Sequence, residues 1–247
     1  VFTDWQGTCS GQVSQTSPIC RISVFGIENV KALFSPAAKL TVQTAGNGTG
    51  TVVSTTPENG INCGTSGTND CDENYVLGTQ VTLTATVGTG SAFTGWSGSA
   101  CNGSTATTCT VTMDAAKTVT ATFTLNIYPL TITMAGTGTG TVARDPAGTA
   151  CTAPETCTAK YNHGTLVKLT ATASSGIFTG WSGGGCSGTD PCTVTMDAAK
   201  GVTATFLPDR TLTVTKVGNG SGTVTSSPTG IECGSDCSEI YALNSVV

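Results

Sequence analysis

Short segments in which every second residue is hydrophobic recur along the chain. The clearest is Val81-Thr-Leu-Thr-Ala-Thr86, and Leu40-Thr-Val-Gln-Thr44 and Leu130-Thr-Ile-Thr-Met134 have the same period. Alternation of this kind is typical of a half-buried β-strand, whereas no stretch has the 3.6-residue period of an amphipathic helix. Threonine makes up about a fifth of the 247 residues, which also favours strands. The pattern therefore predicts an all-β protein.

Glycine-rich pentapeptides follow these strands. They are Gly46-Asn-Gly-Thr-Gly50, Gly136-Thr-Gly-Thr-Gly140 and Gly218-Asn-Gly-Ser-Gly222. Asn-Gly and related dipeptides between apolar runs are typical of tight β-hairpin turns. We therefore expect the first strand to return as a hairpin partner around Thr51-Val-Val53.

A longer motif occurs three times. Phe93-Thr-Gly-Trp-Ser-Gly98 returns as Phe178-Thr-Gly-Trp-Ser-Gly183, and a divergent copy, Phe2-Thr-Asp-Trp-Gln-Gly7, opens the chain. Each copy is followed by two cysteines, and the second cysteine lies 14 residues before a phenylalanine. Such self-similarity at a long period indicates tandem repeats.

The repeat frame predicts four segments. Residues 1–38 hold the second half of a repeat, 39–124 and 125–207 are full repeats, and 208–247 hold the first half of another. The joints between them are short and contain proline. Because proline stiffens a linker, we expect limited swivelling between repeats.

The twelve cysteines fall into six close pairs, two in each full repeat. The expected pairs are Cys9 with Cys20, Cys63 with Cys71, Cys101 with Cys109, Cys151 with Cys157, Cys186 with Cys192, and Cys233 with Cys237. The number of residues between partners varies, whereas a tetrahedral zinc site would hold its ligand spacing. Loop-closing disulfides are therefore favoured over zinc. Disulfides place the protein outside the reducing cytosol.

Each repeat has roughly eighty residues, so its hydrophobic core is small and needs additional stabilisation by cross-links such as disulfides. Short-loop disulfides contribute about 2–3 kcal/mol each. The predicted core anchors are Trp5, Trp96, Trp181, Phe34, Phe123 and Phe206. The predicted core of the first full repeat also includes Leu40, Val42, Val52, Tyr75, Val81, Leu83, Phe93, Val111, Met113 and Val119. The tryptophans would alternatively be exposed platforms on which sugar rings stack, but their recurrence in every repeat favours the core.

Other candidate sites have structural explanations. The acidic loops (Asp70, Asp72 and Glu73; Asp236 and Glu239) resemble calcium ligands, but the second repeat lacks them, so we expect no metal. His163 is the only histidine and lacks a nucleophile nearby in sequence. The sequons at Asn47, Asn102 and Asn219 coincide with Asn-Gly turns. We expect no catalytic residues, no enzymatic activity and no cofactor.

Several linked motifs together resemble one known family. Gly-Asn-Gly-Thr-Gly-Thr-Val, Val-Thr-Leu-Thr-Ala, Phe-Thr-Gly-Trp-Ser-Gly and Val-Thr-Met-Asp-Ala-Ala-Lys are similar to the divergent internalin-B-type B-repeat of bacterial surface proteins. The resemblance covers nearly the whole chain. It implies a small β-grasp-like or β-sandwich repeat, used in tandem in secreted and cell-surface proteins, without catalytic residues.

These observations predict a structural role. We expect a building block of an extracellular bacterial fibre or cell-surface stalk, a semi-rigid rod of repeats that bind copies of themselves, joined head-to-tail through the split repeats at the two ends. The alternative is a carbohydrate-binding or adhesive module of a secreted protein, with glycan partners. The net charge of −5 argues against nucleic acid as a partner. No apolar run is long enough to span a membrane.

Overall fold

The computed structural model describes residues 2–7, 29–56, 58–65, 69–146, 150–152, 155–242 and 245–247. These residues form β-strands and one 3₁₀ turn, η1 (Ser99–Cys101). They divide into two compact units, Val1–Asn126 and Ile127–Val247. Each unit contains one complete repeat and one two-stranded sheet.

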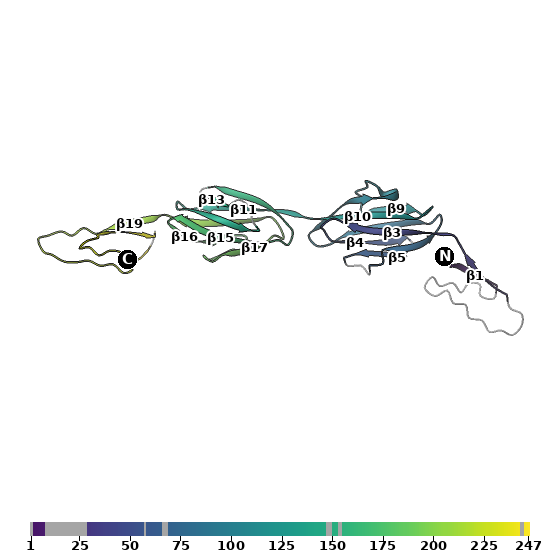
Figure 1. Cartoon of the computed structure of the whole chain (residues 1–247), viewed down its shortest axis with the longest axis horizontal. Helices are drawn as coiled ribbons and strands as arrows, with labels where there is room; N and C mark the ends of the chain where they lie inside the picture. Colours follow the sequence, from purple (N-terminus) through teal and green to yellow (C-terminus); the bar gives the residue numbers. More distant parts are fainter. Residues whose placement is uncertain are drawn as a thin grey trace. The chain divides into compact units, whose positions relative to one another are not determined.

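The first complete repeat consists of two four-stranded sheets with a shared core (Figure 1). Sheet I has the order β6-β3-β10-β8, and sheet II has the order β5-β4-β7-β9. The strands of sheet I are β3 (Ala37–Ala45), β6 (Asp72–Val76), β8 (Ser91–Ser97) and β10 (Lys117–Leu125). Those of sheet II are β4 (Gly50–Thr56), β5 (Glu58–Gly64), β7 (Gln80–Val87) and β9 (Thr108–Thr112).

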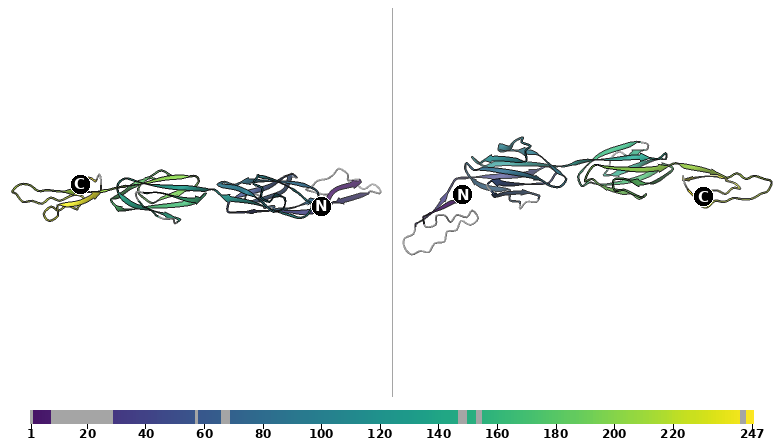
Figure 2. Two further views of the ribbon diagram at one scale, coloured as in Figure 1. Left: turned by 90° about the horizontal axis from the view of Figure 1, so that it is seen from above. Right: turned by 180° about the vertical axis from the view of Figure 1, so that it is seen from behind.

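The second complete repeat has the same topology (Figure 2). Its sheet I has the order β14-β11-β18-β16, and its sheet II has the order β13-β12-β15-β17. The strands of sheet I are β11 (Ile127–Ala135), β14 (Thr156–Asn162), β16 (Ile177–Ser182) and β18 (Lys200–Leu207). Those of sheet II are β12 (Thr139–Asp145), β13 (Cys151–Thr152), β15 (Leu166–Ser175) and β17 (Cys192–Thr195). The predicted all-β tandem repeat is thus confirmed, and the repeat is a β-sandwich.

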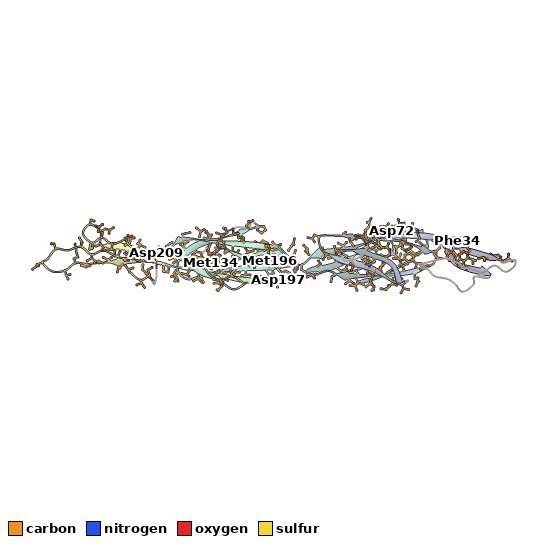
Figure 3. The ribbon with its side chains drawn as sticks, turned by 90° about the horizontal axis from the view of Figure 1, so that it is seen from below. Phe34, Asp72, Met134, Met196, Asp197 and Asp209 are labelled. Carbon is orange, nitrogen blue, oxygen red and sulfur yellow. A yellow bond between two sulfur atoms is a disulfide. The ribbon has the colours of Figure 1, made fainter. Side chains whose placement is uncertain are left out.

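The alternating pattern determines which side chains form the core. In β7, Val81, Leu83 and Ala85 are buried, while the threonines between them face outward. Of the residues predicted for the core of the first full repeat, only Phe93 is half-buried, and the others are buried. In the second repeat, Met134 and Met196 point into the sandwich (Figure 3).

The glycine-rich segments are not hairpin turns, so that expectation is wrong. Gly46–Gly50 connects β3 in sheet I to β4 in sheet II, and the chain crosses the sandwich there. Two features of this crossing require glycine. Gly46 has a φ of 92°, and a Cβ at Gly50 would overlap the ring of Phe123. The glycines therefore allow the crossing chain to pack directly on β10.

The remaining strands form two two-stranded sheets. β1 (Phe2–Gly7) pairs with β2 (Val30–Phe34), and β19 (Asp209–Thr213) pairs with β20 (Ser238–Ala242). Their registers match β8–β10 and β3–β6, respectively. Each is therefore half of a sheet I.

The prediction that Phe34 is a core anchor is wrong. Its side chain is 72% exposed on β2 (Figure 3), whereas the equivalent Phe123 and Phe206 are buried. Gly50 and Gly140 of the facing sheet pack against those two rings. No strand of a facing sheet covers Phe34 among the described residues. Trp5 is half-buried on β1.

Candidate functional site

The Phe-Thr-Gly-Trp motif forms a bulged strand at the edge of sheet I. In β8, Phe93 pairs with Phe123 and Gly95 pairs with Thr122, so Thr94 is the extra residue. Gly95 has a φ of 143°, and a Cβ there would lie 2.9 Å from the carbonyl oxygen of Ser104. A side chain at Gly95 would therefore be strained at this bulge of the first full repeat. The same irregularity occurs in β16 at Gly180 and in β1 at Asp4.

The bulge turns the tryptophan into the core. Trp96 is 3% exposed and Trp181 is 5% exposed. The Nε1–H of Trp96 donates to the carbonyl of Ala106 at 2.8 Å, and its backbone N–H donates to the carbonyl of Ser104 at 2.7 Å. The Nε1–H of Trp181 donates in the same way to the backbone carbonyl of Asp190 at 2.8 Å. Each indole therefore anchors the loop that follows it and offers no face for stacking a sugar.

In every copy of the motif, the phenylalanine at its start contacts both the tryptophan and a second phenylalanine. In the first full repeat the ring of Phe93 lies 5.2 Å from Trp96 and 5.6 Å from Phe123, centroid to centroid. The second repeat has the same arrangement around Phe178. In the opening copy, Phe2 contacts Trp5 at 5.2 Å and Phe34 at 5.8 Å. Tilted aromatic contacts at these distances stabilise a core beyond the area that they bury.

The disulfides join the two sheets at both edges of each sandwich. Cys63 on β5 is bonded to Cys71, which directly precedes β6. Cys101, in η1 after β8, is bonded to Cys109 on β9. Since β5 and β9 are the edges of sheet II, and β6 and β8 are the edges of sheet I, one bridge closes each edge.

The second repeat has the same arrangement. Cys151 is bonded to Cys157, and Cys186 to Cys192, each with Cα atoms 5.7 Å apart. Cys233 and Cys237 are bonded in the last segment.

The sixth expected disulfide is in the opening copy of the motif. Its two cysteines, Cys9 and Cys20, both lie outside the described residues. The bond between Cys9 and Cys20 therefore stays a prediction, whereas the other five expected pairs are bonded as the sequence predicted.

The other candidate residues make local contacts. Asp72 forms an ion pair with Lys39, and Glu73 accepts a hydrogen bond from the backbone N–H of Asn74. Asp236 and Glu239 likewise accept bonds from nearby backbone N–H groups. The ring of His163 lies against Tyr128, 6.1 Å away. Throughout the described part of the chain, no group of three His, Cys, Asp or Glu side chains is placed to hold a metal ion.

One shallow depression lies beside the bulge of the first full repeat. It encloses about 180 Å³ and is lined by Thr94, Gly95, Trp96, Gly103, Ser104 and Thr122. Its lining has no charged side chain, and its volume is below the ~300–1,000 Å³ of a typical small-molecule site. The depression therefore does not define a ligand site.

Arg144 was not singled out by the sequence analysis. It is the only charged side chain among the buried described residues, and it lies where Ser54 lies in the first full repeat. The Ser54 hydroxyl accepts hydrogen bonds from the backbone N–H groups of Gly60 and Ile61. The sequence did contain a signal that could have identified Arg144. In the alternating segment Gly140–Arg144, the arginine places a charge at an inward-facing position.

The turn before the last strand contains an ion pair in both repeats. Lys117 Nζ lies 2.8 Å from Asp114 Oδ1, and Lys200 Nζ lies 2.7 Å from Asp197 Oδ1. The hydrogen bond from the lysine lowers the pKa of each carboxyl group below its ordinary value. A lowered pKa in the folded state stabilises the fold above the ordinary carboxyl range, and this contribution is lost as the pH falls through the folded-state pKa.

We therefore predict that Lys117→Gln raises the pKa of Asp114 towards the ordinary value of about 3.9. Carboxyl-detected NMR titration would measure the change, with Asp197 as the unchanged reference. Lys39→Gln, at an ion pair elsewhere on the sandwich, should leave Asp114 as it is. An unchanged Asp114 pKa in Lys117→Gln would contradict the assignment of the shift to this lysine.

A sequence profile of the divergent InlB B-repeat domain matches residues 60–127 and 128–210. The chain belongs to this family. The resemblance expected from the motifs is thus confirmed, and the B-repeats of this chain are disulfide-bonded β-sandwiches.

Within the described ranges, the structure contains no helix that is both long and apolar enough to cross a membrane.

Comparison with solved structures gives remote similarities. The Bacillus anthracis TIE protein has a TM-score of 0.44 and 8% identity, covering 88% of this chain and 46% of that one. The major pilin T-13 of Streptococcus pyogenes has a TM-score of 0.32 and 11% identity, covering 71% and 98%. The minor pilin GBS52 of Streptococcus agalactiae has a TM-score of 0.24 and 8% identity, covering 74% and 99%.

The chain thus spans about half the length of the TIE protein. No curated protein sequence matches the chain.

Proposed function

We propose that this chain is a structural part of an extracellular stalk or fibre on a bacterial surface, and that it has no catalytic activity. The observation that carries the proposal is the tandem arrangement of two sandwiches with the same topology, separated only by Asn126 between β10 and β11. Disulfides at both edges suit an oxidising compartment. Buried indoles favour this role over the carbohydrate-binding alternative.

Head-to-tail association is the finer part of this proposal. The sheet β20-β19 corresponds to one half of sheet I, and β2-β1 corresponds to the other half. Leu212 on β19 is 41% exposed, whereas the equivalent Leu40 and Leu130 are fully buried. If β19 of one copy pairs with β2 of the next, these apolar side chains gain a partner and the sheet becomes complete.

Sedimentation velocity at increasing concentration tests this association. We expect a concentration-dependent series of elongated oligomers, visible as filaments by electron microscopy. Leu212→Lys should abolish the series, because a charge would then lie on the face to be buried. The matched control is Val217→Lys, at a 91% exposed position outside the strands, and it should assemble normally. A monomer at every concentration would contradict head-to-tail joining, and a compact monomer that binds glycans would contradict the stalk.

A further inference from the structure

The first and last strands of each sandwich are parallel neighbours. β3 and β10 pair over six residues, from Leu40↔Lys117 to Ala45↔Thr122. β11 and β18 pair over six residues in the same way. The other strand pairs of the described residues are antiparallel. In the described part of the chain, the only parallel ladders therefore join the strand through which the chain enters a sandwich to the strand through which it leaves.

This arrangement determines how a sandwich responds to tension. The chain enters at the start of β3 and leaves at the end of β10, which are opposite ends of the same ladder. Pulling on the two ends of the chain drives these strands past each other lengthwise. The evenly spaced hydrogen bonds of a parallel ladder are then loaded together. If the two strands were pulled apart from one end of the ladder, the bonds would break one at a time.

The joints transmit tension directly from strand to strand. One residue, Asn126, separates β10 from β11, and one residue, Pro208, separates β18 from β19. Ser35 and Pro36 separate β2 from β3. At each of these joints a pull along the chain therefore passes from one strand to the next through at most two residues.

The exit end of β10 has additional hydrogen bonds. The N–H of Gly48 donates to the carbonyl of Phe123 at 3.0 Å, and the N–H of Leu125 donates to Asn47 Oδ1 at 3.0 Å. The second repeat keeps the first of these bonds, from Gly138 to Phe206 at 3.0 Å. It has Thr137 in place of Asn47, and threonine has no carboxamide oxygen. The carboxamide bond thus distinguishes the first repeat at the point where tension leaves β10.

We propose that the parallel pair of first and last strands in each sandwich is a shear clamp, and that the chain bears tension along its length. This function deepens the proposed stalk and rests on it, because a stalk is loaded through its two ends. The disulfides lie at the outer edges of the sheets and do not cross the clamp. They limit the length released after the clamp opens, since the loops that they close stay closed.

Single-molecule force spectroscopy on the whole chain tests the clamp. Pulled from its two ends, the chain should give one high-force event for each sandwich. Reducing the disulfides should lengthen the release by about 45 Å in the first repeat, which has two bridges of separation 8, and by about 30 Å in the second, with two of separation 6. These values take ~3.5 Å per residue and subtract the 4.6–5.9 Å that each bridge already spans between its Cα atoms. These different increments identify which sandwich has opened.

The direction of pulling is the decisive variable. A handle on an azide-bearing residue in place of Ala115, combined with the N-terminal handle, loads β3 and β10 at the same end of their ladder. Ala115 is exposed in the turn before β10, so the substitution does not disturb the core. The clamp predicts a markedly lower force for the first sandwich in this geometry. Equal forces in the two geometries would overturn the clamp, whereas the proposed stalk would still be decided separately by the sedimentation test.

Asn47→Thr copies the residue of the second repeat into the first. With end-to-end pulling, the force of the first sandwich should fall towards that of the second, which is the internal control in the same molecule. The reciprocal Thr137→Asn should leave the first sandwich unchanged. If the unfolding force of the first sandwich is unchanged in Asn47→Thr, the hydrogen bond between Leu125 and Asn47 does not contribute to the clamp.

Discussion

Trp96→Ala should destabilise the first full repeat by about 3–5 kcal/mol, the usual cost of truncating a large buried aromatic side chain. The indole is 3% exposed and packs against Phe93 at 5.2 Å. Its loss would also leave the carbonyl of Ala106 without its donor. Because small domains have only about 5–15 kcal/mol of stability, this repeat should melt well below the second.

Differential scanning calorimetry would measure the effect as a separation of two transitions. Trp181→Ala should lower the other transition, because that indole has the same contacts in the second repeat. Trp96→Phe, which keeps an aromatic ring but removes the Nε1–H donor, should give an intermediate loss. An unchanged melting temperature combined with lost glycan binding would instead support the carbohydrate-binding alternative.

Removal of both disulfides should have a comparable effect on one sandwich. In the chain-entropy model each short loop contributes about 2–3 kcal/mol, so replacing Cys63, Cys71, Cys101 and Cys109 together by alanine should cost about 5 kcal/mol. Alanine is preferred to serine because Cys63 and Cys101 are buried, and a buried hydroxyl adds a further penalty. Urea unfolding of the oxidised proteins would measure the loss.

The position of each disulfide predicts which strands lose their protection from hydrogen exchange first when that disulfide is removed. Each pair of cysteines closes one edge of the sandwich, so hydrogen exchange should first accelerate in β5 and β6 when only Cys63 and Cys71 are replaced. It should first accelerate in β8 and β9 when only Cys101 and Cys109 are replaced. Uniform acceleration in either variant would contradict the closure of individual edges. Non-reducing peptide mapping would test the pairing itself, including the predicted bond between Cys9 and Cys20.

Local patterns in the sequence determined the fold class and the repeat. Alternation in segments such as Val81–Thr86 identified the inward-facing residues, because successive side chains of a strand point to opposite faces. The recurrence of the Trp96 motif revealed the repeat unit and led to the family. The close spacing of the cysteines was enough to suggest local pairs, since a short loop brings its two ends together in any fold.

The tertiary structure alone decided which strands pair. Gly46–Gly50 has the composition of a hairpin turn but crosses between the sheets, and β3 instead pairs in parallel with β10, far along the chain. An alternating pattern states which face of a strand is buried but not to which sheet the strand belongs. In a sandwich both sheets face one core, so a hairpin and a crossing produce the same pattern. The sequence failed to predict the exposure of Phe34 for the same reason. A phenylalanine at this position is buried only when a second sheet faces it, and the local motif does not specify that sheet.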